Sequence, residues 1–178
     1  MEAPTTPEEA ARELFREHGS AVYRFAAVLL RQHQDAEDVL QETFLKLLRH
    51  LAGGGRTDNI RGWLFTVAAH AARDRQRRRA RWIPWTFEHD LAVPPARLLD
   101  EDGRLTVVRQ TLLRLSERDR LLLVLWAQQL TYREIASATG IRLSSVGTLL
   151  ARAMDRWEQA CAAIEVPKGV KSERHGLL

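Results

Sequence analysis

The sequence predicts an all-α protein of two small helical domains joined by a flexible acidic linker, the second domain containing a helix-turn-helix. Three observations lead to this prediction. Apolar residues recur at steps of three and four along most of the chain, while the alternation typical of strands is scarce. Residues 82–104 hold three prolines, five acidic residues and two arginines, a composition that interrupts helices. The 178 residues are 45% hydrophobic, which suffices for packed cores and argues against wholesale disorder.

The first domain is expected to span residues 8–81 and to contain three helices. The first should run from Glu8 to about Leu30, with a bend or break expected at Gly19-Ser20. Asp35 is expected to cap the second helix, because a short acidic side chain can accept a hydrogen bond from a free amide of the first turn.

The second helix should end at the three glycines 53–55. Glycine lowers helix propensity and permits positive φ, so three in succession stop a helix. After a polar stretch, the third helix should run from about Ile60 to Arg81, with Trp63 anchoring it in the core.

The second domain is expected to follow the linker of residues 82–104 and to span residues 105–166, leaving a polar tail at 167–178. Its helices are expected near Leu105–Leu115, Glu117–Gln129, Tyr132–Thr139 and Ser144–Ala163.

The last two of these helices have the sequence form of a helix-turn-helix. Thr131 and Glu134 form a capping box, Gly140 supplies the turn, and Ser144 or Ser145 should cap the second helix. A plain helical hairpin is the alternative interpretation. In a helix-turn-helix the second helix enters the major groove of DNA. The residues that would face DNA are Arg142, Ser144, Ser145, Thr148 and Arg152.

The third helix ends in a basic run, residues 73–81, which holds six arginines and one aspartate. A charged helix face in contact with solvent normally mixes signs. This run does not, so a polyanion partner is favoured, because each arginine can form a forked contact with a phosphate.

The second helix carries a contrasting stripe of four residues, here called the acidic stripe: Asp38, Gln41, Glu42 and Leu45. Steps of three and four place these residues on one side of the helix. Taken alone, an ordinary solvated acidic face is the simpler interpretation of this pattern.

Several classes of protein are excluded or disfavoured. No apolar run approaches the roughly 20 residues of a membrane helix, and the N-terminus lacks the pattern of a signal peptide. One cysteine and six unpaired histidines offer neither a disulfide framework nor a structural metal site. No nucleophile–base pair, carboxylate cluster or phosphate-binding glycine motif indicates catalysis. We therefore expect a cytoplasmic, non-enzymatic protein with no cofactor, no metal and no membrane insertion.

The segment Asp35–Leu47, DAEDVLQETFLKL, closely resembles the core-binding motif of bacterial RNA polymerase sigma factors. The spacing to Ile60–Ala68, IRGWLFTVA, and then to the basic run is also similar. The second domain resembles the promoter −35-binding domain of the same proteins. With only a short linker between the domains, the chain resembles the compact extracytoplasmic-function class over about residues 10–160.

The resemblance implies a transcription initiation factor whose partners are core RNA polymerase, promoter DNA and an anti-sigma factor. It implies that the acidic stripe binds the polymerase and that the loop from Ala52 to Asn59 captures an unstacked base of the −10 element. It implies −35 binding by the outward residues of the recognition helix given above. The residues expected at the −10 element are Gly53, Gly54, Gly55, Arg56, Thr57, Asp58, Asn59, Arg61, Arg73, Arg77, Arg78 and Arg81.

Two departures from the family pattern affect these expectations. Ala69-His70 stands where the family usually has Arg-Asn, and Gly147 and Leu149 stand where its recognition helix has basic residues. Weak and relaxed −35 recognition is therefore predicted. The rival function is a helix-turn-helix regulator that binds duplex DNA without polymerase, which leaves the acidic stripe and the glycine loop unexplained.

Overall fold

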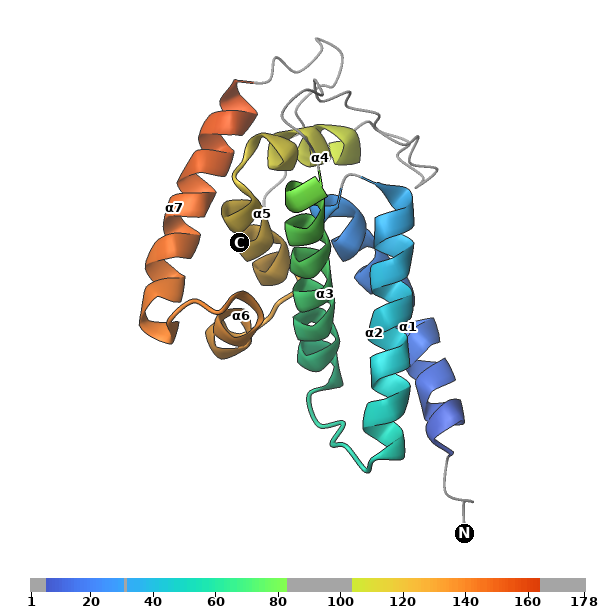
Figure 1. Ribbon diagram of the computed structural model, residues 1–178. Helices are drawn as coiled ribbons and strands as arrows, with labels where there is room; N and C mark the ends of the chain where they lie inside the picture. Colours follow the sequence, from blue (N-terminus) through green and yellow to red (C-terminus); the bar gives the residue numbers. More distant parts are fainter. Residues whose placement is uncertain (1–5, 31, 83–103, 164–178) are drawn as a thin grey trace.

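The computed structural model describes residues 6–30, 32–82 and 104–163, and this part of the chain folds into seven α-helices without a strand (Figure 1). The expected linker, apart from its end residues Trp82 and Arg104, lies outside the described residues, as does the expected tail at 167–178. The all-α fold class is confirmed.

The first domain is formed by three long helices, α1 (Pro7–Leu29), α2 (His33–Ala52) and α3 (Ile60–Trp82). A capping box begins α1, in which Thr6 Oγ1 accepts from the Glu9 amide at 3.2 Å and the Glu9 carboxylate accepts from the Thr6 amide at 3.0 Å. The three helices pack around fully buried side chains. Phe25 and Phe65 meet edge-to-face there, with ring centroids 5.3 Å apart.

The second domain consists of α4 (Arg104–Arg114), α5 (Glu117–Ala127), α6 (Tyr132–Thr139) and α7 (Leu143–Ala162). Five consecutive residues of α5, Leu121–Leu125, are buried, because α1, α6 and α7 all contact this helix. An apolar helix of this kind needs partners around most of its circumference.

The helix-turn-helix expected in this domain is present as α6 and α7. The Thr131–Glu134 capping box is formed in both directions, which confirms that prediction. Gly140 ends α6 with φ of 73°, a left-handed conformation that favours glycine. Ile135 and Val146 hold the two helices together from fully buried positions.

The two domains are packed against each other. Helix α3 lies at the centre of the molecule, with α1 and α2 on one side and the second domain on the other (Figure 1). The contacts between domains join α3 to α6, and α1 to α4 and α5. Buried apolar residues from both domains form one continuous core.

Three expected details of the helices are wrong. Helix α1 passes unbroken through residues 19 and 20, and Gly19 is buried beside the Phe15 ring. Helix α2 begins two residues before Asp35, with Gln32 at its N-cap. Asp35 lies in the first turn instead, where its negative charge still favours the helix dipole. Neither Ser144 nor Ser145 caps α7, whose N-cap is Arg142 without a side-chain hydrogen bond.

A buried arginine of α5, Arg120, binds the C-terminal end of α4. Arg120, only 3% exposed, donates from Nε to the Leu112 carbonyl at 2.9 Å and from Nη2 to the carbonyls of Leu113 and Leu115 at 3.2 and 3.1 Å. The last carbonyls of a helix have no partner within the helix. The side chain of Arg120 therefore supplies a donor to the carbonyls of Leu113 and Leu115, while the Leu112 carbonyl also accepts from the Leu115 amide at 3.2 Å.

We expect Arg120→Met to lower the free energy of unfolding by about 2–4 kcal/mol, because it keeps the apolar stem but removes the side-chain donor from the carbonyls of Leu113 and Leu115. Urea denaturation followed by circular dichroism measures the change. Arg133→Met is the matched control at an exposed side chain, and it should change stability by no more than about 0.5 kcal/mol. Equal effects of the two substitutions would contradict this role of Arg120.

Candidate functional site

The acidic stripe lies along one side of α2. Gln41 is exposed and Leu45 is 56% exposed, whereas Asp38 and Glu42 are half-buried. Leu45 is thus an apolar side chain left in contact with solvent at the end of a polar stripe. A surface of this composition can bind a partner that offers both basic and apolar groups.

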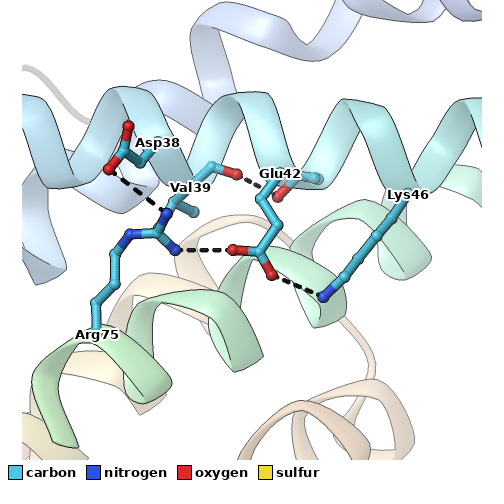
Figure 2. Close-up of polar contacts among 6 residues, drawn as sticks. Asp38, Val39, Glu42, Lys46 and Arg75 are labelled. Atoms are coloured by element: carbon cyan, nitrogen blue, oxygen red, sulfur yellow. Dashed lines mark hydrogen bonds and ion pairs between the residues drawn. The ribbon is translucent and has the colours of Figure 1, made fainter. Parts of the chain in front are cut away.

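Both carboxylates of the stripe are held by Arg75, which reaches across from α3 (Figure 2). Its Nη1 lies 2.9 Å from Glu42 Oε2 and its Nη2 lies 3.6 Å from Asp38 Oδ2. Lys46 Nζ lies 2.8 Å from the other oxygen of Glu42. Hydrogen bonds from Lys46 and then from Arg75 hold the pKa of Glu42 below its usual value. The Glu42 carboxylate is therefore stabilised in its charged form and held between two basic side chains.

The turn between α2 and α3, residues 53–59, is called the glycine loop. Hydrogen bonds tie it back to the end of α2: the amides of Gly53, Gly54 and Gly55 donate to carbonyls of Arg49, Leu51 and His50 at 3.1, 3.0 and 2.8 Å. Of the three glycines, only Gly54 has positive φ, at 73°. The loop thus has a defined shape.

The side chains at the far end of the glycine loop face solvent. Arg56 Nε and Asp58 Oδ2 form an exposed ion pair at 2.6 Å, and Thr57 is exposed as well. Arg61, in the first turn of α3, is exposed and lies over the Phe65 ring at 5.9 Å from its centroid. The fold therefore brings these expected −10 residues together on one end of the first domain.

The basic run divides into arginines with different surroundings. Arg75 binds the acidic stripe and Arg73 binds α6, while Arg77 and Arg78 are exposed. The side chains of Arg79 and Arg81 lie outside the described residues. Two members of the run are thus engaged within the protein, because successive helical residues point about 100° apart and meet different neighbours.

A set of polar contacts between α3 and α6, here called the interdomain clasp, holds the domains together. Arg73 donates to the carbonyls of Thr139 and Ala138 at 2.6 and 2.8 Å. His70 Nε2 lies 3.3 Å from the Ser137 carbonyl in the last turn of α6. A guanidinium at this position satisfies carbonyls that a helix C-terminus leaves free, and it favours the helix dipole.

At the other end of the clasp, Asn59 Nδ2 donates to Glu134 Oε1. Burial would raise the pKa of Glu134, but hydrogen bonds from Thr131 and Asn59 outweigh that effect and lower it. Glu134 thus serves both the capping box of α6 and the contact with α3. A Cβ atom at Gly62 would overlap its carboxylate, so glycine permits the helices to approach.

The expected −35 residues lie on and just before the N-terminal half of α7. Arg142, Ser144, Thr148 and Arg152 are exposed, and Ser145 is half-buried. Gly147 faces Tyr132, because an added Cβ would lie 3.4 Å from the Tyr132 ring. The charged groups of this surface are the arginines at its two ends.

Sequence reasoning did not identify two residues of these sites. The sequence places Arg75 in the basic run, because the spacing of its neighbours gives no sign that it faces α2. His50 was not connected with the glycine loop, yet its ring stacks on Trp63 and its Nε2 lies 2.9 Å from the Arg56 carbonyl. An aromatic residue one turn before a glycine loop is a weak signal that could have pointed to His50.

Within residues 6–30, 32–82 and 104–163, no helix is long and apolar enough to cross a membrane. Nor do three or more His, Cys, Asp or Glu side chains gather there in an arrangement that could hold a metal ion.

Comparison with known families gives two matches in order along the chain. Residues 14–82 match Sigma-70 region 2, and residues 105–156 match Sigma-70 region 4. The first match covers α3 and the acidic stripe, and the second covers the helix-turn-helix.

Among individual proteins, the chain is 28% identical to RNA polymerase sigma factor YlaC of Bacillus subtilis over 152 residues, which is 82% of this chain and 88% of that protein. It is 31% identical to the ECF RNA polymerase sigma factor SigE of Mycolicibacterium smegmatis over 147 residues, 79% of this chain but only 57% of that protein.

Two solved structures share the fold. The sigma factor RpoE in complex with the anti-sigma factor NepR, from Bartonella quintana, matches with a TM-score of 0.66 at 22% identity, over 86% of this chain and 98% of that one. CnrH in complex with the cytosolic domain of CnrY matches with a TM-score of 0.63 at 25% identity, over 89% of this chain and 91% of that one.

Loss of Arg73 should loosen the contact between the domains. Hydrogen bonds from charged donors contribute about 1.5–3 kcal/mol each, and Arg73→Ala removes two such bonds to α6. We expect lower energy transfer between fluorescent dyes attached to α2 and α7. Arg77→Ala removes the same charge from an exposed site one turn away and should leave the transfer unchanged. Identical transfer in both variants would contradict the clasp.

Proposed function

Because this chain belongs to the extracytoplasmic-function class of RNA polymerase sigma factors and is therefore a transcription initiation factor, we propose that the acidic stripe docks on core polymerase while the glycine loop and the basic run hold the −10 element. Initiation then proceeds by binding and strand capture. Nucleotide transfer belongs to the polymerase, and no residue of this chain acts as a catalyst. The proposed site of action is the cytoplasm.

Docking on polymerase is assigned to Asp38, Gln41, Glu42 and Leu45. The observation that carries this assignment is the ordered stripe on α2. There Arg75 holds two carboxylates, and the exposed side chains of Gln41 and Leu45 lie beside them. Groups already held in one conformation lose less entropy when a partner binds.

Capture of the −10 element is assigned to the glycine loop, Arg61 and the exposed arginines of the basic run. An unstacked base needs contacts that offset a few kcal/mol of lost stacking. The hydrogen-bonded loop supports this role, because its backbone is already ordered while Arg56, Thr57 and Asp58 remain exposed. Arg77, Arg78 and Arg81 would neutralise phosphates beside the opened region.

Two residues assigned to the −10 element, Asn59 and Arg73, are bound to the second domain in the interdomain clasp. Their release from Glu134 and from α6 would therefore accompany promoter binding. The packed arrangement is compatible with capture by an anti-sigma factor, and the complex of RpoE with NepR supports a partner of that class for this chain.

Reading of the −35 element is assigned to Arg142, Ser144, Ser145, Thr148 and Arg152. Hydroxyl groups pair with several bases, so most discrimination would come from Arg142, with Arg152 contacting phosphate. The exposure of both arginines supports this division, and the neutral Gly147 between them supports weak binding. Membership of the sigma family disfavours a regulator that acts without polymerase.

Charge reversal in the acidic stripe should weaken docking. Like charges facing each other across an interface cost several kcal/mol, so Asp38→Lys/Glu42→Lys should lower affinity for core polymerase by about tenfold or more. Co-elution of core polymerase with labelled protein at graded concentrations measures the change. The control is Glu13→Lys/Glu17→Lys, the same charge change at exposed side chains on α1, outside the stripe. Equal affinities of the two variants would remove the docking assignment.

The exposed arginines of the basic run should determine the salt dependence of promoter binding. Arg77→Ala/Arg78→Ala should flatten the plot of log affinity against log salt for the holoenzyme by up to about one unit per lost phosphate contact. Arg12→Ala/Arg16→Ala removes the same charge from exposed positions on α1 and should leave the slope intact. A reduced affinity with an unaltered slope would mean that Arg77 and Arg78 do not contact phosphate.

A further inference from the structure

His50, in the last turn of α2, contacts both the glycine loop and α3. Its ring stacks on the Trp63 ring, with centroids 4.8 Å apart and planes 27° from parallel. Its Nε2 lies 2.9 Å from the Arg56 carbonyl oxygen. Its own main-chain carbonyl accepts from the Gly55 amide at 2.8 Å. His50 therefore holds Gly55 and Arg56 of the loop against the end of α2, while its ring contacts Trp63 of α3.

The direction of the hydrogen bond from the ring follows from its partner. A carbonyl oxygen only accepts, so Nε2 carries the hydrogen that is donated to Arg56. This bond fixes the direction of the Arg56 peptide group. The exposed side chains of the loop follow directly after that group.

Gly55 meets a steric requirement imposed by His50. An added Cβ atom would overlap three atoms of the imidazole ring, so the backbone of Gly55 lies directly against it. Gly54 differs, because its φ of 73° favours glycine while the space around it is open. Glycine is therefore favoured at these two neighbouring positions for different reasons. At Gly54 the reason is the backbone conformation, and at Gly55 it is the close approach of the His50 ring.

We propose that His50 is a positioning residue that holds the glycine loop in the shape required to capture an unstacked promoter base. The inference rests on the proposed role of the loop at the −10 element. Ordering a free loop costs conformational entropy for every residue that is fixed. A loop already held by His50 and Trp63 avoids part of that cost when the strand binds.

The test measures both loop order and strand affinity. Loop order is the rate of amide hydrogen exchange at residues 55–59 in the full-length protein. Strand affinity is measured with the reconstituted holoenzyme and one single-stranded oligonucleotide as the probe. This probe is the sequence that wild-type holoenzyme enriches most from a pool randomised over its central positions. Affinity for core polymerase is measured in parallel.

We expect His50→Ala to raise exchange in the loop and to weaken oligonucleotide binding by about tenfold, with core binding unchanged. His50→Gln places an amide donor near the position of Nε2 and should restore most of the affinity. A general loss of stability would not be restored in this way. His33→Ala is the matched control, because His33 is an exposed histidine at the opposite end of the same helix.

A double-mutant cycle tests the steric contact. Gly55→Ala alone should weaken oligonucleotide binding, because its methyl group displaces the ring of His50. In His50→Ala/Gly55→Ala that methyl group meets vacated space, so the double variant should bind no worse than either single variant. Losses that simply add would overturn the contact.

Failure of the inference is distinguishable from failure of the proposed function. Unchanged loop exchange or unchanged oligonucleotide affinity in His50→Ala would overturn the positioning role. Arg56→Ala/Asp58→Ala, which leaves net charge unaltered, tests the loop itself. If that variant loses affinity while His50→Ala does not, only the inference is wrong. If neither variant loses affinity, the loop does not hold the strand and both proposals fail.

Discussion

Two hydrogen bonds from Arg73 to the last carbonyls of α6 reinforce the packing of the two domains beside their shared apolar core. They join the helix that carries the basic run to the helix-turn-helix, and they do so at carbonyls that need a donor in any arrangement. When the domains separate, water must take the place of Arg73 at those carbonyls. Because water replaces only part of this interaction, each bond contributes about 1.5–3 kcal/mol, well below its strength in an apolar medium.

The neighbours of Arg73 illustrate how one helix serves several partners. Arg75 turns towards α2 and pairs with Asp38 and Glu42, whereas Arg77 and Arg78 remain in solvent. A rotation of about 100° per residue distributes adjacent side chains over different faces. Helix α3 therefore links the acidic stripe, the helix-turn-helix and the proposed DNA surface, although residues 73–81 form one uniform basic run in the sequence.

The sequence predicts those features of the fold that depend on local interactions. The capping box of α6 and the glycine that ends it follow from neighbouring residues, and both predictions are confirmed. The predicted start of α2 is wrong, because an aspartate stabilises a helix both as its N-cap and in its first turn, where Asp35 lies. The roles of Arg73, Arg75 and His50 depend on residues distant along the chain or on the fold of a loop. No periodic pattern specifies which of several arginines meets which carboxylate, so these contacts could not be predicted.

The pairing of Arg75 with the acidic stripe raises the question of how a surface can be both neutralised and ready for a partner. Half-exposed ion pairs contribute only about 0–1 kcal/mol, so Asp38 and Glu42 can exchange Arg75 for basic groups of a partner at small cost. Arg75 meanwhile restricts the carboxylates to one conformation. Since the charges are already partly compensated, long-range attraction is weakened. Short-range contacts through the exposed Gln41 and Leu45 then gain in importance. The stripe therefore suits a partner recognised by close fit more than one recruited by charge alone.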